Sequence, residues 1–226
     1  MKNTITSILI MLLLAGLAHA AIISTLNGDV RVRRGLEETW QPASRGMELD
    51  DMDTILTLEG SVELEFDHKT FFMGSHSILD IGDLRDISRR EMFLFLMAQK
   101  VNNIPPRSSD SMRISNASTV HGSKKSADTG QADESDAKWR REYNAAMAMY
   151  DQEFYTNSVV KLHKIRTRYS QVPDCGKIDF LLGKSFEQLD EVGQAVDAYQ
   201  RAIQNACDTL TDMLDEAKQR VSRLSR

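Results

Sequence analysis

The chain has 226 residues, of which 41% are hydrophobic and 27% are charged, and its formal net charge is −5 at pH 7. A chain of this length fits one or two domains. The acidic balance argues against general binding to nucleic acid, because such binding depends on clustered Lys and Arg side chains that neutralise phosphates.

The first twenty residues have the pattern of a secretory signal peptide. Lys2 precedes a short apolar run, and Ala18 and Ala20 occupy the −3 and −1 positions of a cleavage site before Ala21. We expect residues 1–20 to be removed; the alternative is an uncleaved anchor helix, for which the run is short. The sequence therefore predicts a soluble periplasmic or secreted protein with no membrane span after cleavage.

Residues 21–81 are predicted to form an antiparallel β-sandwich or roll. Apolar and polar residues alternate, as around Val30 and Val32, which is typical of strands with one buried face. Asn27-Gly28 is a strong hairpin signal, because both positions accept a positive φ. We expect the chain to reverse there, again at Gly60-Ser61 and at a tip formed by Asp67-His68-Lys69.

A helix is predicted over residues 88–102, with Ser88 and Glu91 at capping-box spacing. It is apolar around most of its circumference, so either the β module or the helices that follow must cover it. We assign residues 21–106 to a β module with this trailing helix. The polar residues 107–135 are predicted to form a flexible linker.

Residues 136–226 are predicted to be helical, and they contain the two cysteines, Cys175 and Cys207. An even number of cysteines in an oxidising compartment predicts one disulfide. The alternative is a pair of buried free thiols that behave as small apolar residues.

The β block carries an ordered series of motifs. A first strand ends in Leu26-Asn27-Gly28-Asp29, and Trp40 follows. A pattern Leu-x-x-Gly-Asp-x-Ile-x-Thr then corresponds to Leu49, Met52, Asp53, Ile55 and Thr57, before Gly60-Ser61 and a closing segment from Ser75 to Ile81. This order resembles the periplasmic FecR-like domain.

Two departures from the FecR-like pattern limit what the resemblance implies. Met52 replaces the usual glycine, and Asp67-His68-Lys69 stands where the family often has Asp-Asp-Gly. The second half of the family's domain is not evident after residue 81. The resemblance implies a β-fold module, without the sigma-factor regulation that requires an inner-membrane anchor and a cytoplasmic tail.

The helical block resembles tetratricopeptide repeats (TPRs). The residues of its clearest unit are Leu182, Gly183, Phe186, Val192, Ala195, Tyr199 and Ala202, and those of a looser upstream unit are Ala145, Ala146, Met149, Tyr155, Ser158, Leu162 and Ile165. A stripe from Leu210 to Leu224 is predicted to cap them. Since at least three repeats are usually needed for stability, we expect a Cys175–Cys207 bridge to contribute about 3–4 kcal/mol.

Helical repeats usually present a groove to a peptide or protein. The candidate partner-binding residues on the first helices of the two units are Arg141, Asn144, Lys184 and Gln188. The alternative is that these residues form an ordinary solvated surface.

No catalytic, metal or cofactor site is predicted. His68, His76 and Asp80 match no standard metal-site spacing. Asp50, Asp51 and Asp53 form an acidic turn that lacks the spacing and glycine of an EF-hand loop. A hydrolase would need His68 or His76 within hydrogen-bond reach of a carboxylate.

The sequence as a whole predicts a non-catalytic scaffold or sensor of a Gram-negative-type envelope, which acts through contacts with a protein or peptide partner. An alternative is recognition of cell-wall glycan by the β module. That alternative requires Trp40, Phe71 and Phe72 to be exposed together.

Overall fold

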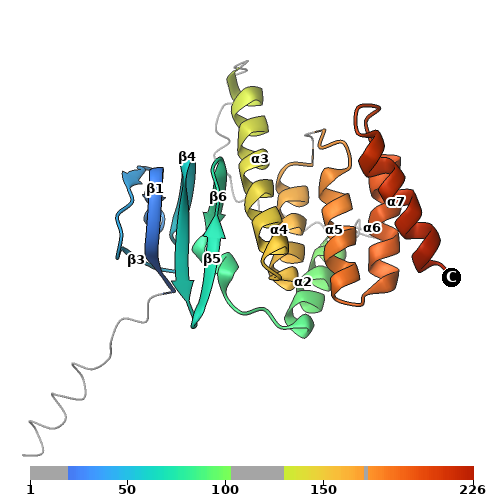
Figure 1. Cartoon of the computed structure of the whole chain (residues 1–226), viewed down its shortest axis with the longest axis horizontal. Helices are drawn as coiled ribbons and strands as arrows, with labels where there is room; N and C mark the ends of the chain where they lie inside the picture. The colour runs from blue at the N-terminus through green and yellow to red at the C-terminus, as the bar shows by residue number, and fades with distance from the viewer. Residues whose placement is uncertain (1–19, 103–129, 171–172) are drawn as a thin grey trace, which may run out of the picture. The chain divides into compact units, whose positions relative to one another are not determined.

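The computed structural model describes residues 20–102, 130–170 and 173–226. The chain forms two compact units that divide between Arg85 and Asp86. An antiparallel sheet makes up the first unit and six α-helices make up the second (Figure 1). The predicted α+β layout, with a β module before a helical domain, is therefore confirmed. Residues 1–19 of the predicted signal peptide and most of the predicted linker lie outside the described residues.

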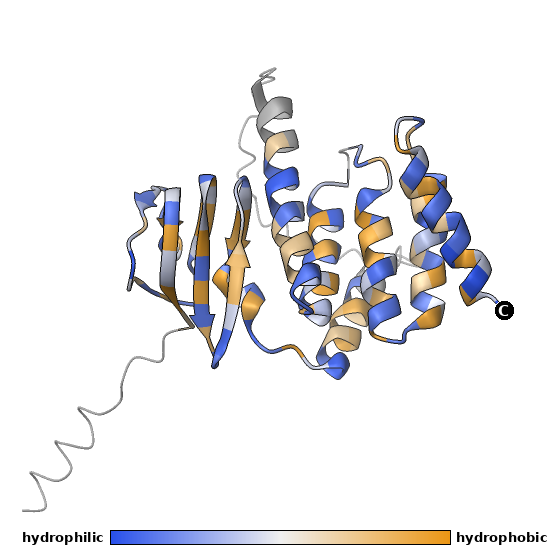
Figure 2. Ribbon diagram, viewed as in Figure 1, coloured by the Kyte–Doolittle hydropathy of each residue, from blue (hydrophilic) through white to orange (hydrophobic). Residues whose placement is uncertain are grey.

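Two long strands, β1 (Ala21–Arg33) and β4 (Thr54–Phe66), pair along nearly their whole length at the centre of a six-stranded sheet. Four short strands pair with the ends of these two. They are β2 (Gln41–Pro42) and β3 (Glu48–Leu49) on β1, and β5 (Lys69–Met73) and β6 (Ser77–Asp80) on β4. Hydrophobic and hydrophilic residues alternate along parts of the long strands (Figure 2), and buried residues alternate with less buried ones in β1 and in the second half of β4, whereas the first four residues of β4 are all buried.

The two glycine turns predicted inside the β block are absent from the described sheet. Gly28 and Gly60 lie opposite each other within β1 and β4, next to a register shift between Gly28 and Val30. A Cβ on Gly28 would lie 2.1 Å from the carbonyl oxygen of Glu59, and Gly28 has a φ of +73°. The prediction of chain reversal is wrong at both glycines, because they serve a bulge where two backbones approach closely.

Alanine at Gly28 is expected to lower the free energy of unfolding of the β unit by about 2 kcal/mol or more, because the new Cβ is both crowded and in an unfavourable φ region. Gly74→Ala is the matched control, since a Cβ there has no atom within 4 Å. Urea denaturation followed by circular dichroism measures both variants. Equal stability of the two variants would contradict this account of the bulge.

The turn predicted at Asp67-His68-Lys69 is present. Asp67 and His68 have φ values of 44° and 61° and connect β4 to β5. Four residues of the Leu-x-x-Gly-Asp-x-Ile-x-Thr pattern, Leu49, Asp53, Ile55 and Thr57, are buried, whereas Met52 is exposed. The Thr57 hydroxyl donates to the Gly74 carbonyl at 2.6 Å and fixes the chain before β6.

The apolar helix α2 (Arg89–Asn102) packs on α4 (Tyr155–Arg168) of the helical unit. Its N-terminus has the predicted capping box: the Ser88 hydroxyl accepts the Glu91 N–H at 3.2 Å, and the Glu91 carboxylate accepts the Ser88 N–H at 3.0 Å. Met92 is fully buried in the helical core. The boundary between the units therefore precedes α2, whereas the sequence-based division placed this helix with the β module at 21–106.

Five further helices pack each on the next along the chain. They are α3 (Gly130–Asp151), α4, α5 (Lys177–Gln188), α6 (Val192–Gln204) and α7 (Thr211–Leu224). The start of α3 lies within the predicted linker 107–135, so the end of that segment is helical. A Cβ on Gly183 would lie 2.6 Å from the Tyr199 ring, which shows how closely α5 and α6 cross. Phe186 and Tyr199 are both buried in the helical core, where the Tyr199 ring lies 5.8 Å from Phe180 on α5 and the Phe186 ring lies 6.4 Å from His163 on α4.

Candidate functional site

Partly exposed polar and aromatic side chains of α3, α5 and α7 contact one another, and we term the surface they form the α3–α5–α7 face. The Lys184 ammonium lies 4.9 Å from the centre of the Tyr150 ring, a cation–π distance. Gln188 hydrogen-bonds the same tyrosine, and the Tyr155 ring lies 5.5 Å from it. Tyr150 is therefore the point at which α3 meets α5 on this face.

Glu187 joins α5 to α7 on the same face. Its carboxylate accepts hydrogen bonds from the Tyr199 hydroxyl at 3.0 Å and from Arg220 at 2.9 Å, and it also pairs with Arg223. Burial and the adjacent Glu187 carboxylate raise the pKa of Tyr199, so the phenol stays protonated and acts as a donor. This group of contacts fixes the position of α7 beside α5.

The structure brings together two of the four predicted partner-binding residues. Lys184 and Gln188 both contact Tyr150. Arg141 precedes Tyr150 by nine residues, which is two and a half helical turns, so the two side chains leave α3 on opposite sides. Asn144 is half-buried on α3.

The sequence interpretation missed the residues that form the centre of the α3–α5–α7 face. Tyr143, Met147 and Tyr150 follow one another on α3 at intervals of four and three residues, which places them on one side of the helix. Met147 is 41% exposed among them. This spacing is the sequence signal that could have identified the side of α3 that faces α5. Tyr150 lies on that side, whereas Arg141 lies on the opposite side.

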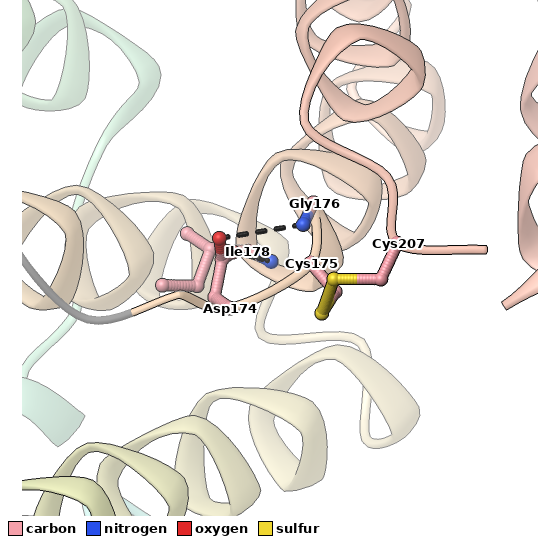
Figure 3. Close-up of a disulfide and its surroundings, with 5 residues drawn as sticks. All are labelled: Asp174, Cys175, Gly176, Ile178 and Cys207. Atoms are coloured by element: carbon pink, nitrogen blue, oxygen red, sulfur yellow. Dashed lines mark hydrogen bonds between the residues drawn. A yellow bond between two sulfur atoms is a disulfide. The ribbon is translucent and has the colours of Figure 1, made fainter. Parts of the chain in front are cut away.

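The disulfide closes one end of the helical unit. The sulfurs of Cys175 and Cys207 are 2.00 Å apart, which joins the residue before α5 to the segment after α6 (Figure 3). Beside it, the Asp174 carboxylate accepts the N–H groups of Gly176 at 3.3 Å and Ile178 at 2.8 Å and thereby caps α5. The predicted pairing is confirmed, and a disulfide fits an extracytoplasmic protein.

Two buried carboxylates hold the helices together through ion pairs. Asp179 on α5 accepts from Arg166 on α4 at 2.9 Å and from Arg201 on α6 at 2.8 Å. Burial, together with these two arginines, lowers the pKa of His163 to about 3, so this imidazole is neutral at physiological pH. These groups connect three helices and have the geometry of structural contacts.

The second carboxylate, Glu142 on α3, lies between α3 and α4. It accepts from Arg168 at 2.7 Å and from the Tyr169 hydroxyl at 2.9 Å. The Lys161 ammonium is 3.5 Å from its other oxygen. A lysine that is only 1% exposed is unusual in a protein core, and the Glu142 charge accounts for its presence.

The acidic and histidine residues of the β unit do not gather around a metal position. His68 and His76 are exposed, and the Asp53 carboxylate is buried against Arg34 at 2.6 Å. Across residues 20–102, 130–170 and 173–226, no group of three or more His, Cys, Asp or Glu side chains could hold a metal ion.

The three aromatic residues considered for glycan binding are not exposed together. Phe71 is fully buried and Phe72 is 54% exposed. Trp40 is half-buried, with the Arg33 guanidinium 5.3 Å from its ring centre.

Among the described helices, none is both long enough and apolar enough to cross a bilayer. Comparisons with family models, curated proteins and solved structures give no match.

Proposed function

We propose that the chain is a non-catalytic extracytoplasmic scaffold or sensor of the periplasm, in which a FecR-like β module and a TPR-like helical domain act through protein–protein contacts. The observation that carries this proposal is the α3–α5–α7 face. It combines the exposed Met147 with Tyr150, Lys184 and Gln188, and Glu187 fixes its helices. Aromatic residues and methionine are enriched at surfaces that bind proteins, and tyrosine is frequent among the residues that contribute most to binding.

Two features of the packing support the finer fold assignments. The long strands bulge at the Gly28–Gly60 pair, which allows one sheet to curve into a sandwich or roll. Gly183 and Ala195 are buried where α5 and α6 cross, and Phe186 and Tyr199 are buried in the same core. This distribution of small and aromatic side chains supports the TPR-like interpretation.

The glycan-binding alternative has less support. A sugar-binding platform needs an exposed aromatic surface, and Phe71 is withdrawn into the core. The neighbouring Phe72 points to the other side of the strand, since successive side chains alternate. We therefore favour a protein partner for this chain.

Site-specific photo-crosslinking in the intact envelope tests the protein-binding proposal. A photoreactive phenylalanine analogue at Met147 or Gln188 is expected to give one discrete crosslinked product, because both positions lie on the α3–α5–α7 face. The same analogue at Gln200, an exposed residue of α6, is the matched control and should give none. Lys184→Glu should weaken the product by removing the cation above Tyr150.

The same products at Gln200, or none at Met147 and Gln188, would overturn the proposal. Mass spectrometry of the crosslinked band identifies whether the partner is a protein. The analogue reports only on its own position. A crosslinked product at Gln200 would therefore show that the partner also contacts a surface outside the α3–α5–α7 face.

A further inference from the structure

One end of the β unit contains a cleft of about 800 Å³. Its walls are Ala20, a turn at residues 34–37, a second turn at 50–53, and Phe66 and Asp67 at the β4–β5 turn. Ile81 and Leu84 of the 3-10 segment η1 (Ile81–Leu84) and the following Arg85 complete the lining. The cleft is formed entirely by the β unit and is separate from the α3–α5–α7 face.

Two large apolar side chains project from the turns of this cleft. Leu36 is 89% exposed and Met52 is 63% exposed. Met52 stands where the FecR-like pattern has glycine, yet it is not among the described residues with a positive φ, so its backbone does not require glycine. The methionine is therefore an apolar group that this chain adds to the surface without a demand from the fold. Exposed apolar groups beside a cleft are typical of binding sites.

The two turns are fixed relative to each other by Asp53. Its carboxylate accepts the N–H of Gly35 at 2.9 Å, the N–H of Asp50 at 2.9 Å and the Arg34 guanidinium at 2.6 Å. Burial acts to raise the pKa of Asp53, but the two N–H donors and Arg34 outweigh it, and the pKa is lowered. Asp53 is thus ionised at neutral pH and holds Leu36 and Met52 in place before any ligand arrives, which reduces the entropy lost on binding.

The rim of the cleft is acidic. Glu37, Asp50, Asp51 and Asp67 are exposed around it, whereas the Arg34 charge is paired with the buried Asp53. The lining also contains a second cation, Arg85. A negative rim around apolar groups favours a ligand that carries positive charge next to an apolar side chain.

We propose that this cleft binds a basic peptide segment of a partner protein. An apolar side chain of the peptide packs between Leu36 and Met52, and its Lys or Arg side chains lie against Asp50, Asp51 and Asp67. The site does not depend on the α3–α5–α7 face having a partner.

Fluorescence polarisation with end-blocked, fluorescein-labelled peptides tests the proposal on the purified chain 21–226. The probe Lys-Leu-Lys-Met-Lys is expected to bind, whereas Lys-Ser-Lys-Ser-Lys and Glu-Leu-Glu-Met-Glu should bind at least about tenfold more weakly. The first of these two peptides lacks the apolar side chains, and the second lacks the positive charges.

Substitutions in the cleft assign the binding to it. Met52→Ser and Leu36→Ser should each weaken the basic apolar probe about tenfold, the expected loss for one buried apolar side chain. Leu94→Ser on α2 is the matched control, because Leu94 is 61% exposed and lies outside the cleft. It should leave the affinity unchanged.

The charge of the rim is tested by Asp51→Asn and Asp67→Asn. Asparagine suits position 67, where φ is 44°, since it tolerates the left-handed region. Each substitution should weaken the probe about threefold and flatten the dependence of affinity on salt.

The proposal is overturned by an absence of probe binding at millimolar concentration, or by equal losses in the Leu94→Ser and Met52→Ser variants. It is also overturned if the chain dimerises and Met52→Ser abolishes the dimer, because a second copy would then occupy the cleft. Lys184→Glu should leave the affinity for the probe peptide unchanged, because Lys184 belongs to the α3–α5–α7 face. Peptide binding to the cleft and partner binding to that face are therefore tested independently.

Discussion

Serine at both Cys175 and Cys207 is expected to lower the free energy of unfolding of the helical unit by about 3–4 kcal/mol. The bridge joins residues 32 positions apart, so it restricts a long loop of the unfolded chain. In the folded chain it encloses α5 and α6, which approach each other closely at Gly183.

Urea denaturation of the oxidised protein and of the double-serine variant measures the effect. Dithiothreitol should lower the stability of the oxidised protein to that of the variant, and it should not affect the variant. Two thiols that react with iodoacetamide in the native, unreduced protein would contradict the prediction, and so would equal stability of the two proteins.

Local signals in the sequence predicted the features that depend on neighbouring residues. The capping box of Ser88 and Glu91 is formed as expected, because its partners are three residues apart. Gly183 was expected at a close helix crossing and lies against Tyr199. In both cases the residue type is almost sufficient to define the contact.

The glycine signals failed for the opposite reason. Asn27-Gly28 permits a positive φ, and Gly28 has one, but the dipeptide does not determine whether the chain reverses. That outcome depends on Gly60, which lies on a strand more than thirty residues away and approaches the Gly28 backbone closely. A bulge between long strands is therefore a tertiary property.

The site residues show the same division between local and tertiary information. Exposure on a helix was predictable for Lys184 and Gln188 from their place among the core positions. The packing of α3 against α4 and α5 determines which side of α3 faces α5, and the sequence does not show this packing. Arg141 was therefore predicted as a site residue, whereas it is Tyr150 that contacts Lys184. The exposed Met52 was noted as a departure from a pattern, and only the structure places it beside Leu36.

Replacement of Glu142 by leucine is expected to destabilise the helical unit by about 3–5 kcal/mol, because it leaves the Lys161 ammonium buried without its carboxylate. Lys161 lies on α4 in the interior, so it cannot reach water without disturbing the contact between α3 and α4. Arg168 and Tyr169 also lose their acceptor in this variant, but both are more exposed than Lys161.

The double variant Glu142→Leu/Lys161→Met separates the cost of burying Lys161 without the Glu142 carboxylate from the loss of a favourable pair. If burial of the lysine without this carboxylate causes the loss, the double variant should recover most of the stability, since apolar groups of similar volume often replace buried ion pairs without cost. Additive losses would instead show that both charges stabilise the fold independently. Asp215→Asn is the control, because its pair with Lys218 is exposed, and it should change the free energy of unfolding by less than about 1 kcal/mol. Thermal and urea denaturation of the four proteins, including the unmodified chain, decide whether Glu142 is retained in the core chiefly to neutralise Lys161.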